Sequence, residues 1–427
     1  MAGGKGTRIR EVACDVPKPM IRINGRPVLE YQLENLKECG IRDIILVVGY
    51  LSDQIKDYFK DGRDLGLNIS YINENEPLGT AGALFFLKED MNEDFLLLMG
   101  DLITGVDFNR FMEFHKKRGK TATLFVHPNS HPYDSDLIVT DGDGKVTAVL
   151  PKNEERSAYY RNQVNAGIYA FSNKVLDLIP EKKKTDLDKE IIKPLISKGE
   201  VEAYRSGEYV KDMGTPDRYE AVAADIKNGI ISARNLKNKQ KCIFLDRDGT
   251  INEYCGFVRR PEELKLMDGT AEAIRRINSS EYLCIVVTNQ PVIARGECSF
   301  EDVEEINAKL ETELGKKGAY IDDIFYCPHH PDKGFEGEVP ELKVDCNCRK
   351  PKTGLLERAA ERYNIDLNSS YMIGDMTMDI QCGKNGGLAT VLVETGVAGK
   401  DGKYDVIPDL KARDLSEAVE LIFMRLA

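Results

Sequence analysis

Short apolar runs of strand length alternate with amphipathic segments along the whole chain. Residues 44–48 form a continuous apolar run followed by a helical pattern over 52–60, and residues 95–99 precede a second helical pattern over 108–118. Beyond residue 240 the alternation continues, with apolar runs at 242–245, 284–287 and 371–373. Continuous apolar strands between helices are typical of parallel sheets covered on both faces. The pattern therefore predicts an α/β fold.

The length of the chain and one polar segment predict two domains. The chain has 427 residues, and a domain usually holds about 100–200. Residues 235–240 are polar and weakly periodic, and a strand ending in carboxylates follows at once. We therefore expect one domain over residues 1–232, a linker over 233–240 and a second domain over 241–427.

Composition excludes several classes of function. The formal net charge of -12 disfavours a nucleic-acid partner, because binding to phosphate backbones needs clustered Lys and Arg. No apolar run approaches the ~18 residues of a membrane helix, and no signal peptide is evident. The ten cysteines then indicate thiols or metal ligands rather than disulfides. We expect a cytoplasmic protein that acts on small molecules, without nucleic-acid or membrane partners.

The strand over 242–245 ends in two carboxylates, Asp246 and Asp248. Ligand sites of open α/β sheets lie beyond the carboxyl ends of strands, so both can face one site. A carboxylate can attack phosphorus when a cation screens its charge, and a second one can protonate the leaving alcohol and then activate water. Taken alone, the pair could equally be an acidic surface turn.

Three later features favour a catalytic site over an acidic surface turn. Thr288 and Asn289 follow the next strand and suit phosphate oxygens, and the cation Lys350 could neutralise a phosphoryl group. Asp375 follows a further strand and would be a third oxygen ligand for Mg²⁺. The sequence thus predicts a magnesium-dependent phosphatase in the second half.

This order of motifs resembles the haloacid dehalogenase (HAD) superfamily, and the runs 244–252 and 288–290 resemble its heptose bisphosphate and histidinol phosphatase branch. The resemblance implies a HAD-like Rossmannoid fold. It implies the following roles: Asp246 as nucleophile, Asp248 as general acid and base, Mg²⁺ at Asp246, Asp248 and Asp375, phosphate at Thr288, Asn289 and Lys350, and sugar at Arg349. Pro291, Val292 and Met376 differ from the residues that members of this branch commonly have. These differences bear on the identity of the substrate and leave the phosphatase chemistry unchanged.

Two close pairs of soft ligands indicate a second metal. Cys327 and His329 form one pair, and Cys346 and Cys348 the other. Three thiolates and an imidazole complete a tetrahedral zinc site with no open position, so we expect structural Zn²⁺ that holds the loop before Arg349. Scattered surface cysteines are the alternative. His330 is a competing ligand, but the resemblance favours His329.

The N-terminal half opens on a glycine-rich turn that contains cations. Such a turn can surround nucleotide phosphates, although a flexible terminus looks much the same. With the later segments 77–82, 100–101, 165–167 and 211–216, it resembles the sugar-1-phosphate nucleotidylyltransferases, which are Rossmann-like, over about residues 1–225. The resemblance implies a triphosphate site at Gly3, Gly4, Gly6, Thr7, Arg8 and Lys18, base contacts at Gly79, Thr80 and Ala81, sugar phosphate at Lys152 and Asn165, and Mg²⁺ at Asp101 and Asp212.

One departure concerns the start of this half. Members of the family place an apolar strand directly before the glycine-rich turn, and here Met1 stands in that place. Either the natural protein is several residues longer, which we favour, or the domain is a weakened form. Adding an upstream apolar segment and assaying nucleotidyl transfer distinguishes the two.

The activities predicted for the two halves can act in series. We expect removal of the 7-phosphate of D-glycero-D-manno-heptose 1,7-bisphosphate, followed by nucleotidyl transfer, with GTP as donor, to the heptose 1-phosphate. One alternative is a mannose- or other hexose-1-phosphate nucleotidylyltransferase fused to a histidinol-phosphate-type phosphatase. Another is a working phosphatase with an inactive, nucleotide-binding regulatory domain.

Overall fold

The computed structural model describes residues 1, 16–89, 91–156 and 158–425. These residues form two compact units. The N-terminal unit comprises Met1–His127, Ile138–Leu150 and Asn165–Asn235, and the C-terminal unit comprises Pro128–Leu137, Pro151–Val164 and Leu236–Ala427. The C-terminal unit therefore contains two segments that the sequence places within the first half.

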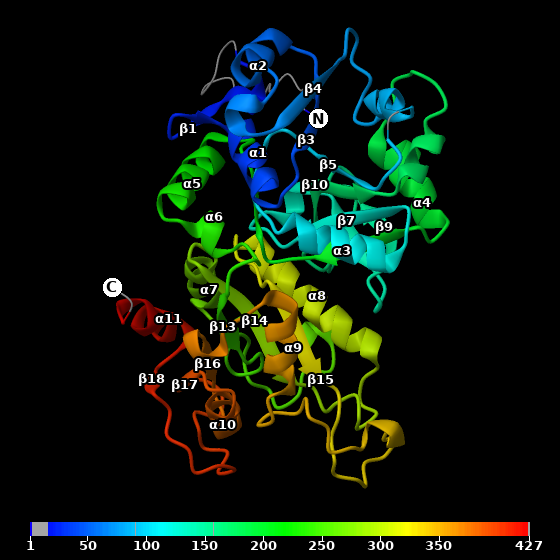
Figure 1. Cartoon of the computed structure of the whole chain (residues 1–427). Helices are drawn as coiled ribbons and strands as arrows, with labels where there is room; N and C mark the ends of the chain where they lie inside the picture. The colour runs from blue at the N-terminus through cyan, green and yellow to red at the C-terminus, as the bar shows by residue number, and fades with distance from the viewer. Residues whose placement is uncertain (2–15, 90, 157, 426–427) are drawn as a thin grey trace. The chain divides into compact units, whose positions relative to one another are not determined.

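The C-terminal unit is built on an all-parallel sheet (Figure 1). Its strand order is β15-β14-β13-β16-β17-β18. The strands are β13 (Lys241–Leu245), β14 (Tyr282–Asn289), β15 (Asp323–Cys327), β16 (Tyr371–Gly374), β17 (Ala389–Val393) and β18 (Leu410–Ala412), and the helices are α7 (Thr270–Asn278), α8 (Phe300–Lys316), α9 (Gly354–Tyr363), α10 (Thr377–Asn385) and α11 (Leu415–Met424).

Both faces of this sheet are buried. Ile243 and Leu245 of β13 pack in one core with residues of α7, α8 and α11, whereas Phe244 packs in a second core with residues of α9. Successive side chains of a strand point to opposite faces, so an uninterrupted apolar run is what a doubly covered strand requires. The predicted parallel sheet is confirmed here.

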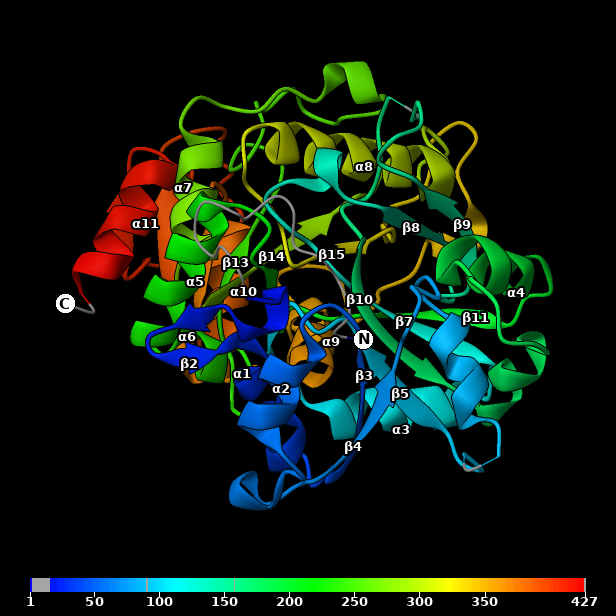
Figure 2. The same ribbon diagram turned by 90° about the horizontal axis from the view of Figure 1, so that it is seen from above.

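The N-terminal unit contains several sheets. The largest has the order β11-β7-β10-β8-β9, with β5 also paired to β10, and β7, β10 and β11 can be followed in Figure 2. The strands are β1 (Arg22–Ile23), β2 (Arg26–Pro27), β3 (Asp43–Val48), β4 (Asn68–Asn73), β5 (Phe95–Leu98), β6 (Leu102–Gly105), β7 (Ala122–His127), β8 (Leu137–Thr140), β9 (Val146–Leu150), β10 (Val164–Phe171), β11 (Val201–Arg205) and β12 (Tyr209–Asp212), and the helices are α1 (Val28–Glu38), α2 (Ser52–Phe59), α3 (Phe108–Arg118), α4 (Lys193–Ser197), α5 (Pro216–Lys227) and α6 (Ile230–Ala233).

The strand directions differ between the two units. In the N-terminal unit β11 pairs with β7 in parallel, but β10 is antiparallel to both β5 and β8. The expectation of parallel strands therefore holds only in part here. An apolar run reports burial on both faces, and it does not encode the direction of the neighbouring strand.

Met1 lies beside the end of β5. Its terminal amino group donates to the Leu98 carbonyl oxygen at 2.9 Å, and its own carbonyl oxygen accepts from the Gly100 N–H at 2.8 Å. Met1 thus makes main-chain hydrogen bonds along this strand. In the described part of the chain, β3 and β4 form a separate parallel pair.

Candidate functional sites

Three carboxylates gather at the carboxyl edge of the C-terminal sheet. Asp246 follows β13 and Asp375 follows β16, and these two strands are adjacent, with Leu245 opposite Ile373. Asp379 lies in the first turn of α10, and one carboxylate oxygen from each of the three lies within 4.8 Å of the others. The parallel register therefore brings together residues that are far apart in sequence.

Lys350 neutralises part of this acidic cluster. Its Nζ donates to Asp246 Oδ1 at 2.7 Å and to the Val287 carbonyl oxygen at 2.9 Å, and it lies 2.6 Å from Asp379 Oδ1. The side chain is almost fully buried. Burial alone would lower the pKa of Lys350, but the charges of Asp246 and Asp379 raise it above the usual range. The group is therefore a fixed cation beside the predicted nucleophile.

Asp375 is the carboxylate whose charge is least compensated. One of its oxygens accepts from the Val397 N–H at 2.7 Å, whereas the other, Oδ1, is buried without a hydrogen-bond partner. Burial and the neighbouring charges of Asp246 and Asp379 raise the pKa of Asp375 to about 8. Burial, with the charge of Asp246, also raises the pKa of Asp379 to about 6.

Two glycines allow this arrangement. Gly249 has φ +88° and Gly396 has φ +58°, and a Cβ on either one would come within 2.4 Å or 2.1 Å of Asp375 Oδ2. Only glycine fits at such positions. The free oxygen, the mutual repulsion and the all-oxygen donor set fit a hard divalent cation such as Mg²⁺.

Asp248 lies next to this cluster but is not one of the three clustered carboxylates. It accepts hydrogen bonds from the side chains of Arg247, Asn252 and Gln290. Burial would raise the pKa of Asp248, but the Arg247 charge and these hydrogen bonds hold it below its usual range. The predicted Mg²⁺ contact of its side chain therefore stays a prediction, and Asp379 is the residue that the sequence reasoning did not assign. Its spacing of four residues after Asp375 was the available signal.

The predicted phosphate contacts lie on the same edge. Thr288 is buried near the end of β14, and its hydroxyl accepts from the Gln290 amide at 3.0 Å. Asn289 accepts from the Lys350 main-chain N–H at 3.0 Å and donates to its carbonyl oxygen at 3.2 Å. Asn289 thus orients the segment that carries Lys350. Arg349 donates to the His329 carbonyl oxygen at 3.1 Å, and burial lowers its pKa.

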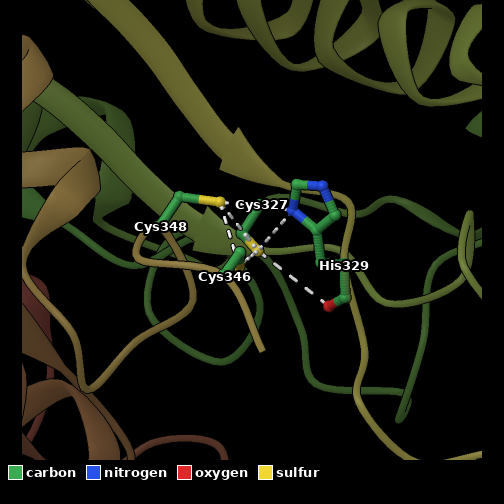
Figure 3. A group of neighbouring side chains, drawn as sticks. All are labelled: Cys327, His329, Cys346 and Cys348. Carbon is green, nitrogen blue, oxygen red and sulfur yellow. Dashed lines mark hydrogen bonds between the residues drawn. The ribbon is translucent and has the colours of Figure 1, made fainter. Parts of the chain in front are cut away.

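The four predicted zinc ligands converge (Figure 3). The Cys348 sulfur lies 3.3 Å from the Cys327 sulfur, 3.2 Å from the Cys346 sulfur and 3.3 Å from His329 Nδ1. Hydrogen bonds from its neighbours lower the pKa of the Cys348 thiol to about 5, while the pKa of Cys327 is raised. Three sulfurs and one imidazole nitrogen are a donor set that suits Zn²⁺. His330 is not part of this group; its ring lies 3.4 Å from an Arg295 nitrogen.

The predicted nucleotide-site carboxylates of the N-terminal unit each lie beside a cation. Asp101 pairs with Lys18, which the sequence analysis assigned to the triphosphate. Asp212 accepts from Arg218 Nη1 at 3.0 Å and from the Gly214 N–H at 2.6 Å. Burial would raise the pKa of Asp212, but the Arg218 charge and these bonds lower it. Arg218 was missed by the sequence reasoning, because the resemblance gives it no role.

The other predicted nucleotide and sugar-phosphate contacts of the N-terminal half lie in several different segments. Gly79 has φ +80° and packs against the Thr185 main chain, and the Thr80 hydroxyl accepts from the Leu187 N–H at 2.7 Å. Ala81 is buried beside them. Asn165 lies in β10 and bonds the Tyr169 hydroxyl, whereas Lys152 belongs to the C-terminal unit. Gly3, Gly4, Gly6, Thr7 and Arg8 lie outside the described residues.

Residues 1–229 match the family model described as nucleotidyl transferase, and residues 347–418 match the one described as HAD-hydrolase-like. Over 167 residues the chain is 41% identical to the D-glycero-beta-D-manno-heptose-1,7-bisphosphate 7-phosphatase of Pasteurella multocida, covering 38% of this chain and 88% of that protein. Over 240 residues it is 32% identical to the mannose-1-phosphate guanylyltransferase of Mycobacterium tuberculosis, covering 56% of this chain and 66% of that protein's length.

Among solved structures, the chain is similar to a D,D-heptose 1,7-bisphosphate phosphatase from B. bronchiseptica in complex with magnesium and phosphate. The identity is 32%, the match covers 44% of this chain and 99% of the other, and the TM-score is 0.39. Within the residues that the structure describes, no helix combines the length and apolar character needed to cross a membrane.

Proposed function

The chain belongs to the nucleotidyl transferase family through its N-terminal half and carries a HAD-like hydrolase domain in its C-terminal half, and on this premise we propose that it is a bifunctional enzyme of heptose activation. One site removes the 7-phosphate of D-glycero-D-manno-heptose 1,7-bisphosphate. The other transfers a nucleotidyl group to the remaining 1-phosphate. Both reactions act on small soluble substrates, in keeping with a cytoplasmic enzyme.

The observation that carries the phosphatase half is the buried contact between Asp246 and Lys350 at the carboxyl edge of the parallel sheet. The Asp246 carboxylate attacks the phosphorus of the 7-phosphate, and the bond from phosphorus to the sugar oxygen breaks. Asp248, carrying the proton that it takes from water in the second step of the preceding turnover, gives it to that oxygen. In the second step Asp248 takes a proton from water, which attacks the aspartyl-phosphate and releases inorganic phosphate.

The neighbouring residues bind and orient the substrate. Thr288, Asn289 and Lys350 hold the transferring phosphate, and Arg349 contacts the sugar. Lys350 lowers the cost of bringing a phosphate anion against a carboxylate, because its cation is fixed in a buried position. Mg²⁺, when bound at Asp246, Asp375 and Asp379, with Asp248 beside them, supplies further positive charge at the phosphoryl oxygens.

The cysteine–histidine cluster has a structural role in this proposal. Zn²⁺ at Cys327, His329, Cys346 and Cys348 holds the loop that runs directly into Arg349 and Lys350. These four ligands would fill a four-coordinate zinc site, so the metal would offer no open position to a substrate. The metal therefore orders the rim of the site.

In the transferase half, the 1-phosphate oxygen attacks the α-phosphorus of a nucleoside triphosphate and pyrophosphate leaves. Such a reaction depends mainly on orientation and charge neutralisation. Lys18 and the segment from Gly3 to Arg8 bind the triphosphate, Gly79 to Ala81 the base, and Asn165 the sugar phosphate. Asp101 and Asp212 hold Mg²⁺. We propose GTP as donor, which the similarity to a guanylyltransferase supports.

A single panel tests this proposal. The full chain is incubated with the heptose 1,7-bisphosphate, Mg²⁺ and each of the four nucleoside triphosphates, and phosphate, pyrophosphate and the nucleotide sugar are measured. We expect phosphate release in every reaction and pyrophosphate release with GTP. No phosphate release from the bisphosphate contradicts the heptose assignment.

The similarity to a mannose-1-phosphate guanylyltransferase also favours a second candidate. In that case the transferase uses a hexose 1-phosphate, and the phosphatase acts on another phosphomonoester such as histidinol phosphate. Mannose 1-phosphate and histidinol phosphate in the same panel distinguish the two. A domain that only regulates would instead be stabilised by nucleotide without releasing pyrophosphate.

A further inference from the structure

Arg247 stands between the two catalytic carboxylates in sequence, and it is fully buried. Its guanidinium turns back onto Asp248, with Nε 3.1 Å from Oδ1 and Nη2 2.9 Å from Oδ2. The remaining terminal nitrogen, Nη1, donates to Asn307 Oδ1 at 3.2 Å. Asn307 lies in the middle of α8 and is itself fully buried. The arginine thus joins this helix to the carboxylate.

We propose that Arg247 is a positioning residue that fixes the carboxylate plane of Asp248, and that Asn307 of α8 holds Arg247 in place. This inference rests on the proposed role of Asp248 as acid and base. It goes beyond that role by naming the residues that aim the carboxylate.

The geometry explains why an arginine is needed. Each oxygen of Asp248 accepts two hydrogen bonds: Oδ1 from Arg247 and Asn252, and Oδ2 from Arg247 and Gln290. The rigid fork of a guanidinium contacts both oxygens at once and so opposes rotation of the carboxylate about its own axis. Lysine, a single point donor, cannot replace it in this respect.

The main chain of Arg247 adds to the anchoring. Its carbonyl oxygen accepts from the N–H groups of Ile251 at 2.9 Å and Asn252 at 3.2 Å. The same residue therefore closes the turn after β13 and aims the side chain of Asp248. Asn307 accepts the hydrogen bond of the third guanidinium nitrogen of Arg247. Without this acceptor the nitrogen would be an unpaired donor in a buried site, which is costly.

The test uses leaving groups of different basicity. A sugar alkoxide needs a proton as it leaves, whereas p-nitrophenolate leaves without one. Phosphoenzyme formation is measured in a single turnover of the full-length protein with the heptose 1,7-bisphosphate and with p-nitrophenyl phosphate. The variants are Asn307→Leu, which keeps the side-chain volume, and Arg247→Lys, which keeps the charge. Arg260→Ala is the matched control, because this arginine is exposed and pairs with Glu263.

We expect both variants to slow phosphoenzyme formation from the sugar phosphate by about 10²-fold, the scale of a general-acid contribution. Formation from p-nitrophenyl phosphate and the KM values stay within about threefold in the same proteins, because binding and nucleophilic attack do not need the aimed proton. Since the two variants change different residues, misfolding of one leaves the other to decide.

Equal losses with both substrates, or no loss with the sugar phosphate, overturn the inference while the wild type remains a phosphatase. If the wild type and Arg260→Ala release phosphate from neither substrate, the proposed function fails and this inference fails with it.

Discussion

At the scale of single residues, the surroundings of Asp375 favour a bound cation. Asp375 is buried between two glycines and two further carboxylates, with one oxygen unpartnered. Such an arrangement is unfavourable by itself, because like charges repel strongly away from water. A bound divalent cation would remove both the repulsion and the unmet hydrogen-bonding capacity.

We therefore predict that Asp375→Asn raises the thermal stability of the metal-free protein while it removes the response to magnesium. In the wild type, Mg²⁺ at about 100 times its dissociation constant should add about 2.7 kcal/mol of stability, followed as a rise in melting temperature of the C-terminal unit. Asp345→Asn, at an exposed position outside the cluster, is the control. A variant that still responds to Mg²⁺ like the wild type would contradict the assignment.

At the scale of elements, helix α8 contacts both Arg247 and a segment from the first half of the sequence. It carries Asn307, and it is also held by residues 158–164, which we call the strap. Thr312 exchanges hydrogen bonds with the Tyr160 main chain, at 2.9 Å and 3.0 Å. Glu311 is fully buried and accepts from Arg161 Nε at 3.1 Å and from the Asn162 N–H at 2.6 Å. The strap therefore belongs to the core of the phosphatase unit.

The second prediction concerns this strap. Arg161→Ala leaves the buried Glu311 carboxylate without its cation, and we expect a loss of about 3 kcal/mol in the unfolding free energy of the C-terminal unit. Urea unfolding followed by phosphatase activity measures it. Arg156→Ala, just before the strap in sequence, is the matched control, because Arg156 bonds the Pro132 and Ser135 carbonyl oxygens rather than α8. Unchanged stability of Arg161→Ala would show that the strap does not stabilise the C-terminal unit.

The zinc loop gives a third prediction at this scale. Cys348→Ser removes a thiolate that contacts the other three ligands, so the purified protein should lose its stoichiometric zinc. Because the loop leads into Arg349 and Lys350, we also expect a KM for the bisphosphate about tenfold higher. Cys255→Ser, an exposed cysteine outside the cluster, should keep zinc content and KM. Metal analysis decides it: full zinc occupancy in Cys348→Ser argues against the site.

At the scale of the whole molecule, the two candidate sites draw on separate sets of residues. Asp246, Lys350, Asp375 and Asp379 belong to the C-terminal unit, and Lys18, Asp101 and Asp212 belong to the N-terminal unit. Each site can therefore be disabled alone. The order of the two reactions is set by the intermediate, the heptose 1-phosphate.

A fourth prediction follows from this separation. Asp246→Asn should lose phosphate release by on the order of 10⁴-fold or more and keep nucleotidyl transfer to the 1-phosphate, whereas Asp212→Asn should do the reverse. Mixed together, the two variants should form the nucleotide sugar from the bisphosphate, measured as pyrophosphate release. Failure of the mixture, with each remaining activity intact, would mean that the intermediate does not pass through solution.

The sequence by itself determined the fold class, the two families and the residue types from which the two sites are proposed. Strand-end carboxylates, a downstream lysine and two pairs of soft ligands are local patterns, and the residue types alone limit what they can bind. The comparisons confirm the two family resemblances. The glycine-rich segment at Gly3 to Arg8 lies outside the described residues, and its role stays a prediction.

Only the tertiary structure decided which of these residues meet. Asp379 joins the acidic cluster because α10 begins directly after β16, and Asp248 turns toward Arg247 because Asn307 of a distant helix holds that arginine. The strap packs on α8 through an ion pair between Arg161 and the buried Glu311 that spans 150 residues of sequence. Periodicity and motif spacing report local burial and residue type, whereas these contacts depend on strand register and helix packing, which bring distant segments together.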